Sequence, residues 1–570
     1  MSSSTMPTSR SVNIGSRLTA MAKRVPDQLA VVMPWNDRRS RPRAGQTRSY
    51  RWVTFAELER DSNIVAAGLQ RMGVKPGTRI VLLVRPGIEF VMLTFSLFKA
   101  GAVTILIDPG MGRQHLLDCL QQARPEGFVA IPLAHIARLL HRKRFPQARY
   151  FVTVGRRWGW GGTTLRRLMK GTTDGYRTVS TTAEDPAAII FTSGSTGPPK
   201  GVLYRHGNFD TQVEEIRRRY DIQPGGRDLA GFPLFGLFNS AMGVTTIIPD
   251  MDASRPASVD PCKIVEAIED WQIDQAFASP AVWNAVGRHC VDAKLKLPTL
   301  RRVLSAGAPV PTHVLRNLQE TIAPDGEIWT PYGATESLPV ASISARQVLS
   351  ETAEKSATGA GTCVGTRFER IQWKVIRISD HPIATLADAE PLSRGQIGEL
   401  IVRGPVVTTE YVTRTESNAW SKISDGDSFW HRMGDVGYLD EGDRFWFCGR
   451  KAHRVQTDGG PMFTIPCEAI FNQHPRVFRS ALVGVGTVPH QSPAVVFETW
   501  PNATPANDRD RDQLIEELHQ LGQRYEHTKV IPREQLFHHP SLPVDVRHNA
   551  KIFREQLAMW ASEQINGRKG

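Results

Sequence analysis

The chain has few cysteines and lacks a long run of apolar residues. Its six cysteines, in 570 residues, are scattered without the paired spacing of a zinc site or a disulfide framework, which favours reduced thiols. The most apolar stretch, residues 80–107, is interrupted by Arg85, Glu89 and Lys99, so we expect no membrane span. The basic residues near the N-terminus enclose no apolar block, which argues against a secretory signal. We therefore expect a cytoplasmic protein.

Basic residues exceed acidic ones, and the formal net charge is +13. The basic clusters at residues 38–43, 142–144 and 217–219 lie far apart in the sequence and carry no interleaved aromatic residues, so we expect no nucleic-acid partner. A generally basic surface is the simplest interpretation, and its positive potential would also attract small anionic substrates. The hydrophobic content of 41% and the charged content of 22% are typical of a globular protein.

Helix and strand signals alternate along the first part of the chain. Such alternation indicates an α/β fold, in which helices cover both faces of parallel sheets. The predicted elements are helices over residues 54–72 and 87–100, strands over residues 79–84 and 103–107, and a return of the same pattern between residues 264 and 305.

Polar breaks divide the chain. Those at residues 38–49, 350–362 and 500–512 are rich in small and polar residues and predict loops. A new pattern begins near residue 450, and the chain is long enough for two or three domains. We therefore predict one domain over residues 1–449 and a smaller one over residues 450–570.

The segment FTSGSTGPPKG, residues 191–201, concentrates glycine, hydroxyl groups and one lysine directly after a short apolar strand signal. Glycines let backbone amides approach an anion closely, and hydroxyls and a lysine add donors and charge, so the segment predicts a phosphate-binding loop. The alternative is a Gly/Ser surface turn. The segment differs from the common nucleotide P-loop, because Pro199 and Gly201 flank the lysine. The predicted contacts are Thr192, Ser193, Gly194, Ser195, Thr196, Gly197 and Lys200.

Four further motifs follow in order. They are SAGAPV at residues 305–310, PYGATE at 331–336, HRMGDVGYLD at 431–440, and HNAKIFREQL at 548–557. Each has a plainer interpretation when taken alone, such as a strand-to-helix turn, a helix cap or a solvated lysine.

Together, these motifs resemble those of the adenylate-forming superfamily, which includes acyl-CoA synthetases, luciferases and the adenylation domains of peptide synthetases. The resemblance extends over nearly the whole chain. It implies a large N-terminal α/β domain of parallel and mixed sheets covered by helices, and a small, mobile α+β C-terminal lid domain that carries the catalytic lysine. It also implies ATP and Mg²⁺ as cofactors.

The resemblance assigns roles to matching residues. It implies that Tyr332 supports adenine, that Thr335 contacts the α-phosphate, and that Glu336 holds magnesium. Asp435 matches a carboxylate that accepts both ribose hydroxyls, and Lys551 matches a lysine that neutralises the substrate carboxylate and the α-phosphate. Thr335, Glu336 and Lys551 are thus the expected catalytic residues. The remaining nucleotide contacts that it implies are Gly307, Ala308, Pro309, Gly333 and Arg450.

Three departures from the superfamily pattern concern the second half of the reaction. Gly236 stands where many members have histidine, which predicts extra room beside the reacting carboxylate. Ala452 stands where the hinge usually has Asp or Lys, and Ala550 replaces a glycine before Lys551. A non-polar hinge puts in doubt the domain rotation that builds a CoA site. The predicted substrate pocket is Phe235, Gly236, Leu237 and Phe238.

These departures resemble the branch of the superfamily that forms β-lactones in bacterial long-chain olefin biosynthesis. That resemblance implies a long-chain 2-alkyl-3-hydroxy fatty acid as substrate, with its own β-hydroxyl as the second nucleophile. It also implies an assembly with a reductase and a β-lactone decarboxylase. A long-chain acyl-CoA ligase and a catalytically weak adenylate-binding protein remain alternatives. His206 is a candidate base, and a structural histidine is the plainer interpretation of that position.

Overall fold

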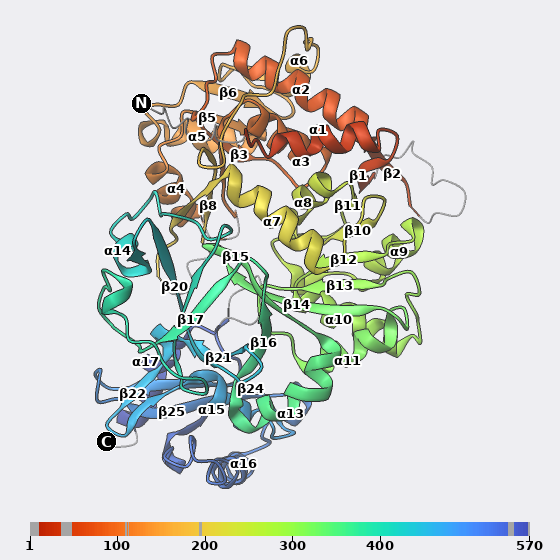
Figure 1. The fold of residues 1–570 in the computed structure, drawn as a ribbon. Coiled ribbons are helices and arrows are strands. Elements are labelled where there is room, and N and C mark those ends of the chain that lie inside the picture. Colours follow the sequence, from red (N-terminus) through yellow and green to blue (C-terminus); the bar gives the residue numbers. More distant parts are fainter. Residues whose placement is uncertain are drawn as a thin grey trace.

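The computed structural model describes residues 11–35, 48–108, 111, 113–192, 197–544 and 552–567. Two large sheets dominate this part of the chain, one of 14 strands and one of seven (Figure 1). A three-stranded sheet and a two-stranded hairpin lie towards the C-terminus. No helix in the described ranges is both long enough and apolar enough to cross a bilayer.

The seven-stranded sheet has the order β7-β6-β5-β3-β4-β8-β9. Its middle strands are parallel and almost fully buried, which explains their near-continuous apolar sequences. The predicted helices and strands between residues 54 and 107 are confirmed within one or two residues. The elements are α2 (Phe55–Arg71), β3 (Arg79–Leu83), α3 (Ile88–Lys99), β4 (Val103–Leu106), β5 (Gly127–Ala130), β6 (Tyr150–Thr153), β7 (Thr163–Thr164), β8 (Pro186–Phe191) and β9 (Gly201–Arg205).

The 14-stranded sheet is mixed. Six of its strands are parallel, and from β14 onward its strands pair antiparallel. The parallel strands are β1 (Leu29–Pro34), β10 (Arg227–Ala230), β11 (Thr245–Ile247), β12 (Gln275–Ala278), β13 (Arg302–Ser305) and β14 (Glu327–Ala334). The antiparallel ones include β15 (Ser337–Ser344), β16 (Thr362–Arg367), β17 (Gln372–Ile376), β18 (Gly398–Arg403), β20 (Ser428–Leu439) and β21 (Arg444–Arg450). Helices α9 (Pro261–Trp271), α10 (Pro280–Asp292) and α11 (Thr312–Thr321) connect the parallel strands, as βαβ crossovers require.

The C-terminal part is a small α+β unit with cores of its own. Two apolar clusters draw all their buried members from between Val455 and Ala561. The unit contains α15 (Thr464–Phe471), β24 (Val477–Val485), β25 (Ser492–Thr499), α16 (Asp508–Gly522), β26 (Leu536–His538) and α17 (Arg554–Gly567), drawn in blue in Figure 1. The boundary at residue 450 stays a prediction.

Two predicted loops differ from the structure. Residues 345–360 form a run of α- and π-helical turns, so the loop predicted over 350–362 is wrong. Ser344 and Gln347 form a capping box that starts this run, a local signal that outweighs the polarity of the segment. The loop predicted over 500–512 also ends too late, because α16 begins at Asp508 under an Asn507 cap. Residues 38–47 of the third predicted loop lie outside the described residues.

Candidate active site

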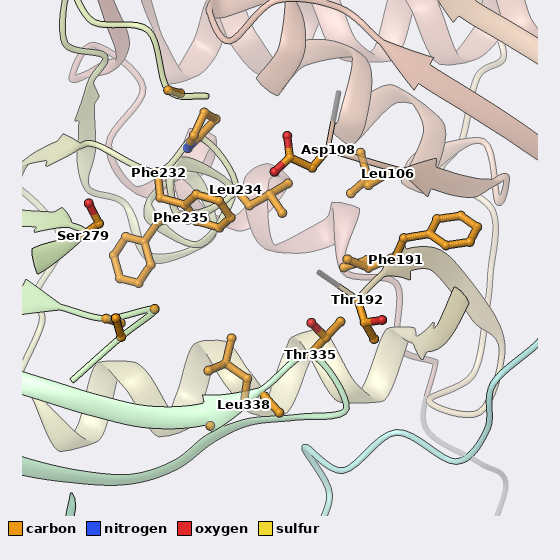
Figure 2. A pocket seen from close by; sticks show the side chains of 18 of the residues that line it. Leu106, Asp108, Phe191, Thr192, Phe232, Leu234, Phe235, Ser279, Thr335 and Leu338 are labelled. Atoms are coloured by element: carbon orange, nitrogen blue, oxygen red, sulfur yellow. The ribbon is translucent and has the colours of Figure 1, made fainter. Parts of the chain in front are cut away.

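A cavity of about 2920 Å³ lies where the two large sheets and the C-terminal unit meet. Residues that follow parallel strands line it, as expected for an open α/β sheet, where ligands bind at the carboxyl ends of strands. Figure 2 shows Asp108 after β4, Thr192 after β8 and Ser279 after β12 around one space, with Thr335 and Phe235 on its other sides.

Two hydrogen bonds between Thr192 and Lys200 close the base of the predicted phosphate loop. The Lys200 backbone amide donates to Thr192 Oγ1 at 3.1 Å, and the Thr192 amide donates to the Lys200 carbonyl at 3.0 Å. Gly197 has a φ of 143° with no atom near its Cβ position, so the turn exploits the freedom of glycine. Thr192, Gly197 and Lys200 all line the cavity. The predicted contacts Ser193, Gly194, Ser195 and Thr196 lie outside the described residues.

Thr335 and Glu336 form the tight turn between β14 and β15, at the cavity wall. Tyr411 Oη donates to Glu336 Oε1 at 2.6 Å, and Tyr204 Oη donates to the Thr335 carbonyl at 2.6 Å. Burial, together with the negative charge of Glu336, raises the pKa of Tyr411. The tyrosine therefore stays a neutral donor that fixes one carboxylate oxygen and leaves the other for a further ligand.

The backbone of this turn is held as well. The Glu336 carbonyl accepts hydrogen bonds from the Thr408 amide at 2.9 Å and from Thr408 Oγ1 at 3.0 Å. Lys422 Nζ donates to the Thr408 carbonyl, and Lys200 Nζ lies 4.8 Å from the centre of the Tyr411 ring. Burial lowers the pKa of Lys422 to about 7. Glu336 thus sits among donors and two lysines, which is a suitable environment for a site that takes phosphate and a cation.

Asp435 is buried between Tyr332 and Arg450. Tyr332 Oη donates to Asp435 Oδ2, and Arg450 Nη1 lies 2.8 Å from Asp435 Oδ1. The pairing follows from the register, because Asp435 and Arg450 are cross-strand partners on β20 and β21. Burial raises the pKa of Asp435, while Arg450 opposes that rise, and burial raises the pKa of Tyr332 well above its usual value. The structure thus joins three residues that lie up to 118 positions apart in the sequence.

A family model described as "AMP-binding enzyme" matches residues 18–412 of the chain. The chain belongs to the AMP-binding enzyme family. Two relatives named olefin beta-lactone synthetase are each 44% identical to it. The match to the one from Xanthomonas campestris pv. campestris covers 97% of this chain and 98% of that relative. The match to the one from Stenotrophomonas maltophilia covers 98% of this chain and 100% of that relative. The crystal structure of ATP-bound MatB from Rhodopseudomonas palustris shares the fold, with a TM-score of 0.76 at 19% identity, and the match covers 97% of this chain and 99% of that one.

The predicted adenine loop of this AMP-binding enzyme follows β13. Gly307, with a φ of 99°, turns the chain, and Ala308 and Pro309 line the cavity beside it. Across the cavity, Gly333 packs against the β14–β15 turn, where a Cβ would lie only 2.7 Å from the Ser337 carbonyl. The structure therefore brings all the described members of the predicted nucleotide set to one cavity.

The predicted substrate pocket is only partly formed as expected. Phe235, Leu237 and Phe238 on α8 (Phe235–Met242) line the cavity, and Phe235 stacks on Phe277 at 4.2 Å between ring centres. Gly236 does not line it. A Cβ there would lie 3.0 Å from Thr246 Cγ2. Gly236 therefore faces β11, which corrects the expectation that its missing side chain leaves room for the acyl group.

His206 is a structural residue. Its ring is fully buried, its Nδ1 accepts the Ile14 backbone amide at 3.2 Å, and it does not line the cavity. Burial lowers the pKa of His206 to about 4. This geometry fits the structural interpretation of His206 and not its interpretation as a base. His431, by contrast, lines the cavity, and its Nδ1 lies 3.1 Å from the Ser421 carbonyl.

Lys551 lies outside the described residues, but the chain that follows it is placed. Ile552, Phe553 and Arg554 line the cavity. Arg554 forms a bidentate ion pair with Glu468 on α15, in which Nη2 lies 3.0 Å from Oε2. The pair anchors the end of the C-terminal segment at the cavity.

The hinge is polar in spite of Ala452, because its neighbours bind the N-terminal part. Lys451 Nζ lies 3.2 Å from Glu399 Oε2 and 3.1 Å from the Ser379 carbonyl. Arg432 Nη2 lies 2.5 Å from the same Glu399 oxygen, and both of these side chains are at most 2% exposed. Lys451 therefore ties the hinge to a buried charge on β18.

Sequence reasoning missed Tyr411, Thr408 and Lys422. They come from a segment in which no motif is recognised, and only its packing against the β14–β15 turn brings Tyr411 and Thr408 to Glu336, with Lys422 on the Thr408 carbonyl.

Proposed function

We propose that the protein is an ATP-dependent ligase that converts a long-chain 2-alkyl-3-hydroxy fatty acid into a β-lactone, with AMP and pyrophosphate as the other products, in long-chain olefin biosynthesis. The observation that carries the proposal is the 44% identity to two olefin beta-lactone synthetases over nearly the whole chain. The cavity supports it, because phosphate-loop, carboxylate and apolar groups converge there.

The first step joins the substrate carboxylate to AMP. A carboxylate oxygen attacks the α-phosphorus, and the bond from that phosphorus to the pyrophosphate oxygen breaks. Lys200 and the phosphate loop would hold the departing pyrophosphate, and Thr335 and Lys551 would stabilise charge on the α-phosphate. The placement of Ile552 to Arg554 in the cavity supports the role of Lys551.

The second step closes the ring. The β-hydroxyl oxygen attacks the acyl carbon, the bond from that carbon to AMP breaks, and the hydroxyl proton passes to a base. Intramolecular attack needs the hydroxyl and carbonyl held together with water excluded, which the apolar wall around Phe235 supports.

ATP and Mg²⁺ are the proposed cofactors, and the residues fit both. Tyr332, Asp435 and Arg450 would hold the nucleoside. Glu336 presents one carboxylate oxygen bound by Tyr411 and another without a hydrogen-bond partner among the described residues. Mg²⁺ typically takes one or two carboxylates, with water and phosphate oxygens as its other ligands. Bound there, it would neutralise phosphate charge.

The test is product analysis with and without CoA. The protein is incubated with ATP, Mg²⁺ and a synthetic 2-alkyl-3-hydroxy acid, and mass spectrometry identifies the product. We expect AMP and β-lactone without CoA. Strict dependence on CoA would instead identify an acyl-CoA ligase, and no turnover of ATP with any carboxylate would identify an adenylate-binding protein.

A matched pair of variants tests the lysine. Lys551→Ala should abolish ATP–pyrophosphate exchange, whereas Lys529→Ala, which removes an exposed lysine paired with Glu526, should not. Equal exchange rates in the two variants would remove Lys551 from the mechanism.

Cellular context is also part of the proposal. A cytoplasmic location is supported by six free cysteines. Assembly with a reductase and a β-lactone decarboxylase stays a prediction from the resemblance, and co-purification with those two enzymes would test it.

A further inference from the structure

Helix α5 (Pro132–Leu140) has its polar side chains inside and its apolar side chains outside. His135 and Arg138 are buried, with exposures of 0% and 7%, whereas Leu133 and Leu140 are 71% and 78% exposed. The buried pair is accommodated by aromatic rings, because His135 stacks on Trp160 at 5.6 Å and the Arg138 guanidinium lies over a neighbouring ring. A surface helix normally shows the opposite arrangement. The exposed apolar face of α5, which we call its outer stripe, therefore requires an explanation.

The outer stripe faces the same cavity as the nucleotide residues. Leu133, Ile136, Ala137 and Leu140 recur at helical spacing and all line it. Leu116 and Leu117 of α4 (Arg113–Gln122) line it as well. We call the space bounded by these six residues the α4–α5 groove. Leu139 is on the same helix and is also exposed, but it does not line the cavity.

The groove continues directly from the reaction site along one edge of the seven-stranded sheet. The strand order β5-β3-β4-β8 places four carboxyl ends side by side. Ile131, Val84, Asp108 and Thr192 follow these strands, and each lines the cavity. Three strand spacings of about 4.8 Å give a path of roughly 14 Å, and nine residues of α5 add about 13 Å. In Figure 2, Leu106 and Asp108 mark the side of the space that leads towards this edge, opposite Phe232 and Phe235.

We propose that the α4–α5 groove binds one of the two hydrocarbon chains of the substrate, while the wall around Phe235 binds the other. This inference rests on the proposed function, since a 2-alkyl-3-hydroxy acid carries two chains on adjacent carbons that cannot share one narrow tunnel. The occupant is a hydrocarbon because the lining is aliphatic and continuous with the carboxylate-activating site. Burying a chain there would also cover the exposed leucines.

Two substrate series test the groove. In one, the chain on C2 grows from methyl while the chain on C3 stays fixed, and in the other the reverse holds. The rate of pyrophosphate release gives kcat/KM. In the unmodified protein we expect kcat/KM to rise with length in both series, by up to roughly fourfold for each methylene that becomes buried.

Leu140→Asp should remove the length dependence in one series only. The long members of that series should lose tenfold or more, while its methyl member and the other series keep their rates. Leu139→Asp is the matched control and should leave both series unchanged. Leu140 is 78% exposed and Leu139 is 39% exposed, so neither belongs to the buried core, and thermal unfolding checks that both variants fold. Equal effects of the two variants, or a uniform loss in both series, would overturn the proposal.

Direct binding keeps this test separate from the test of the proposed function. A fluorescent long-chain fatty acid should bind several-fold more weakly to Leu140→Asp than to Leu139→Asp, whether or not the acids are turned over. Unchanged probe binding would overturn the groove proposal even if β-lactone is formed. If Leu140→Asp instead lost binding to anionic vesicles or to a pathway enzyme, with chain-length dependence intact, the stripe would be a docking surface and the proposal would also fail.

Discussion

The buried charge beside the hinge gives the sharpest stability prediction. Glu399 is 1% exposed and accepts from Arg432, which is 2% exposed, and from Lys451 at 3.2 Å. Glu399→Gln keeps the shape of the side chain and removes its charge, so Arg432 is left buried without a counterion. Removing one partner of a buried ion pair costs about 3–5 kcal/mol. In a large domain each kcal/mol lowers the midpoint temperature of thermal unfolding by about 2 °C, so this midpoint should fall by about 6–10 °C.

A pair on the surface supplies the control. Arg377 and Glu390 form a two-fold ion pair as close as the buried one, but their side chains are 68% and 56% exposed. Glu390→Gln should leave the transition unchanged, because water and salt screen such pairs. Thermal unfolding by circular dichroism, recorded at matched salt, compares the two variants. Equal shifts, or no shift for Glu399→Gln, would refute the reasoning that burial makes this charge essential.

Three further predictions concern single groups. Tyr411→Phe removes the donor to Glu336, so the Mg²⁺ concentration needed for half-maximal pyrophosphate exchange should rise about tenfold or more, consistent with a charge-assisted hydrogen bond; an unchanged requirement would contradict this role. The fold keeps His206 neutral, because its pKa is about 4 against 6.5 in the unfolded chain, so the free energy of unfolding should fall as the pH drops from 6.5 to 4. Urea titrations should show a smaller fall in His206→Asn, and this variant should retain activity. Gly236→Ala should lower stability by about 1 kcal/mol through crowding against Thr246, without changing which chain lengths are accepted; an altered chain-length preference would restore Gly236 to the pocket.

The sequence predicted local features well. The strands at 79–83 and 103–106 and the helices at 55–71 and 88–99 were readable because hydrophobic periodicity is a property of short windows. The motif around Glu336 was also readable, because its turn carries several chemically distinctive residues in six positions.

Features that depend on packing between distant segments could not be predicted in this way. Tyr411 reaches Glu336 only because residues 404–411 lie against the β14–β15 turn. The direction that Gly236 faces depends on how α8 is oriented against β11, and the residues next to it in the sequence do not determine that orientation. The inverted polarity of α5 was hidden for the same reason, since its periodicity is that of an ordinary amphipathic helix and only the fold shows which face is inside.

The contact between Tyr332 and Asp435 has a consequence for how a nucleotide would enter. In this structure the phenol already donates to the carboxylate that we propose as the ribose ligand. A ribose hydroxyl arriving there exchanges one hydrogen bond for another and adds none, so the contact itself contributes little net affinity. A ligand must therefore compete with Tyr332 for Asp435, and it gains affinity only if it also gives the displaced tyrosine ring a new partner. An adenine base stacked on that ring would meet this condition, and a free sugar would not.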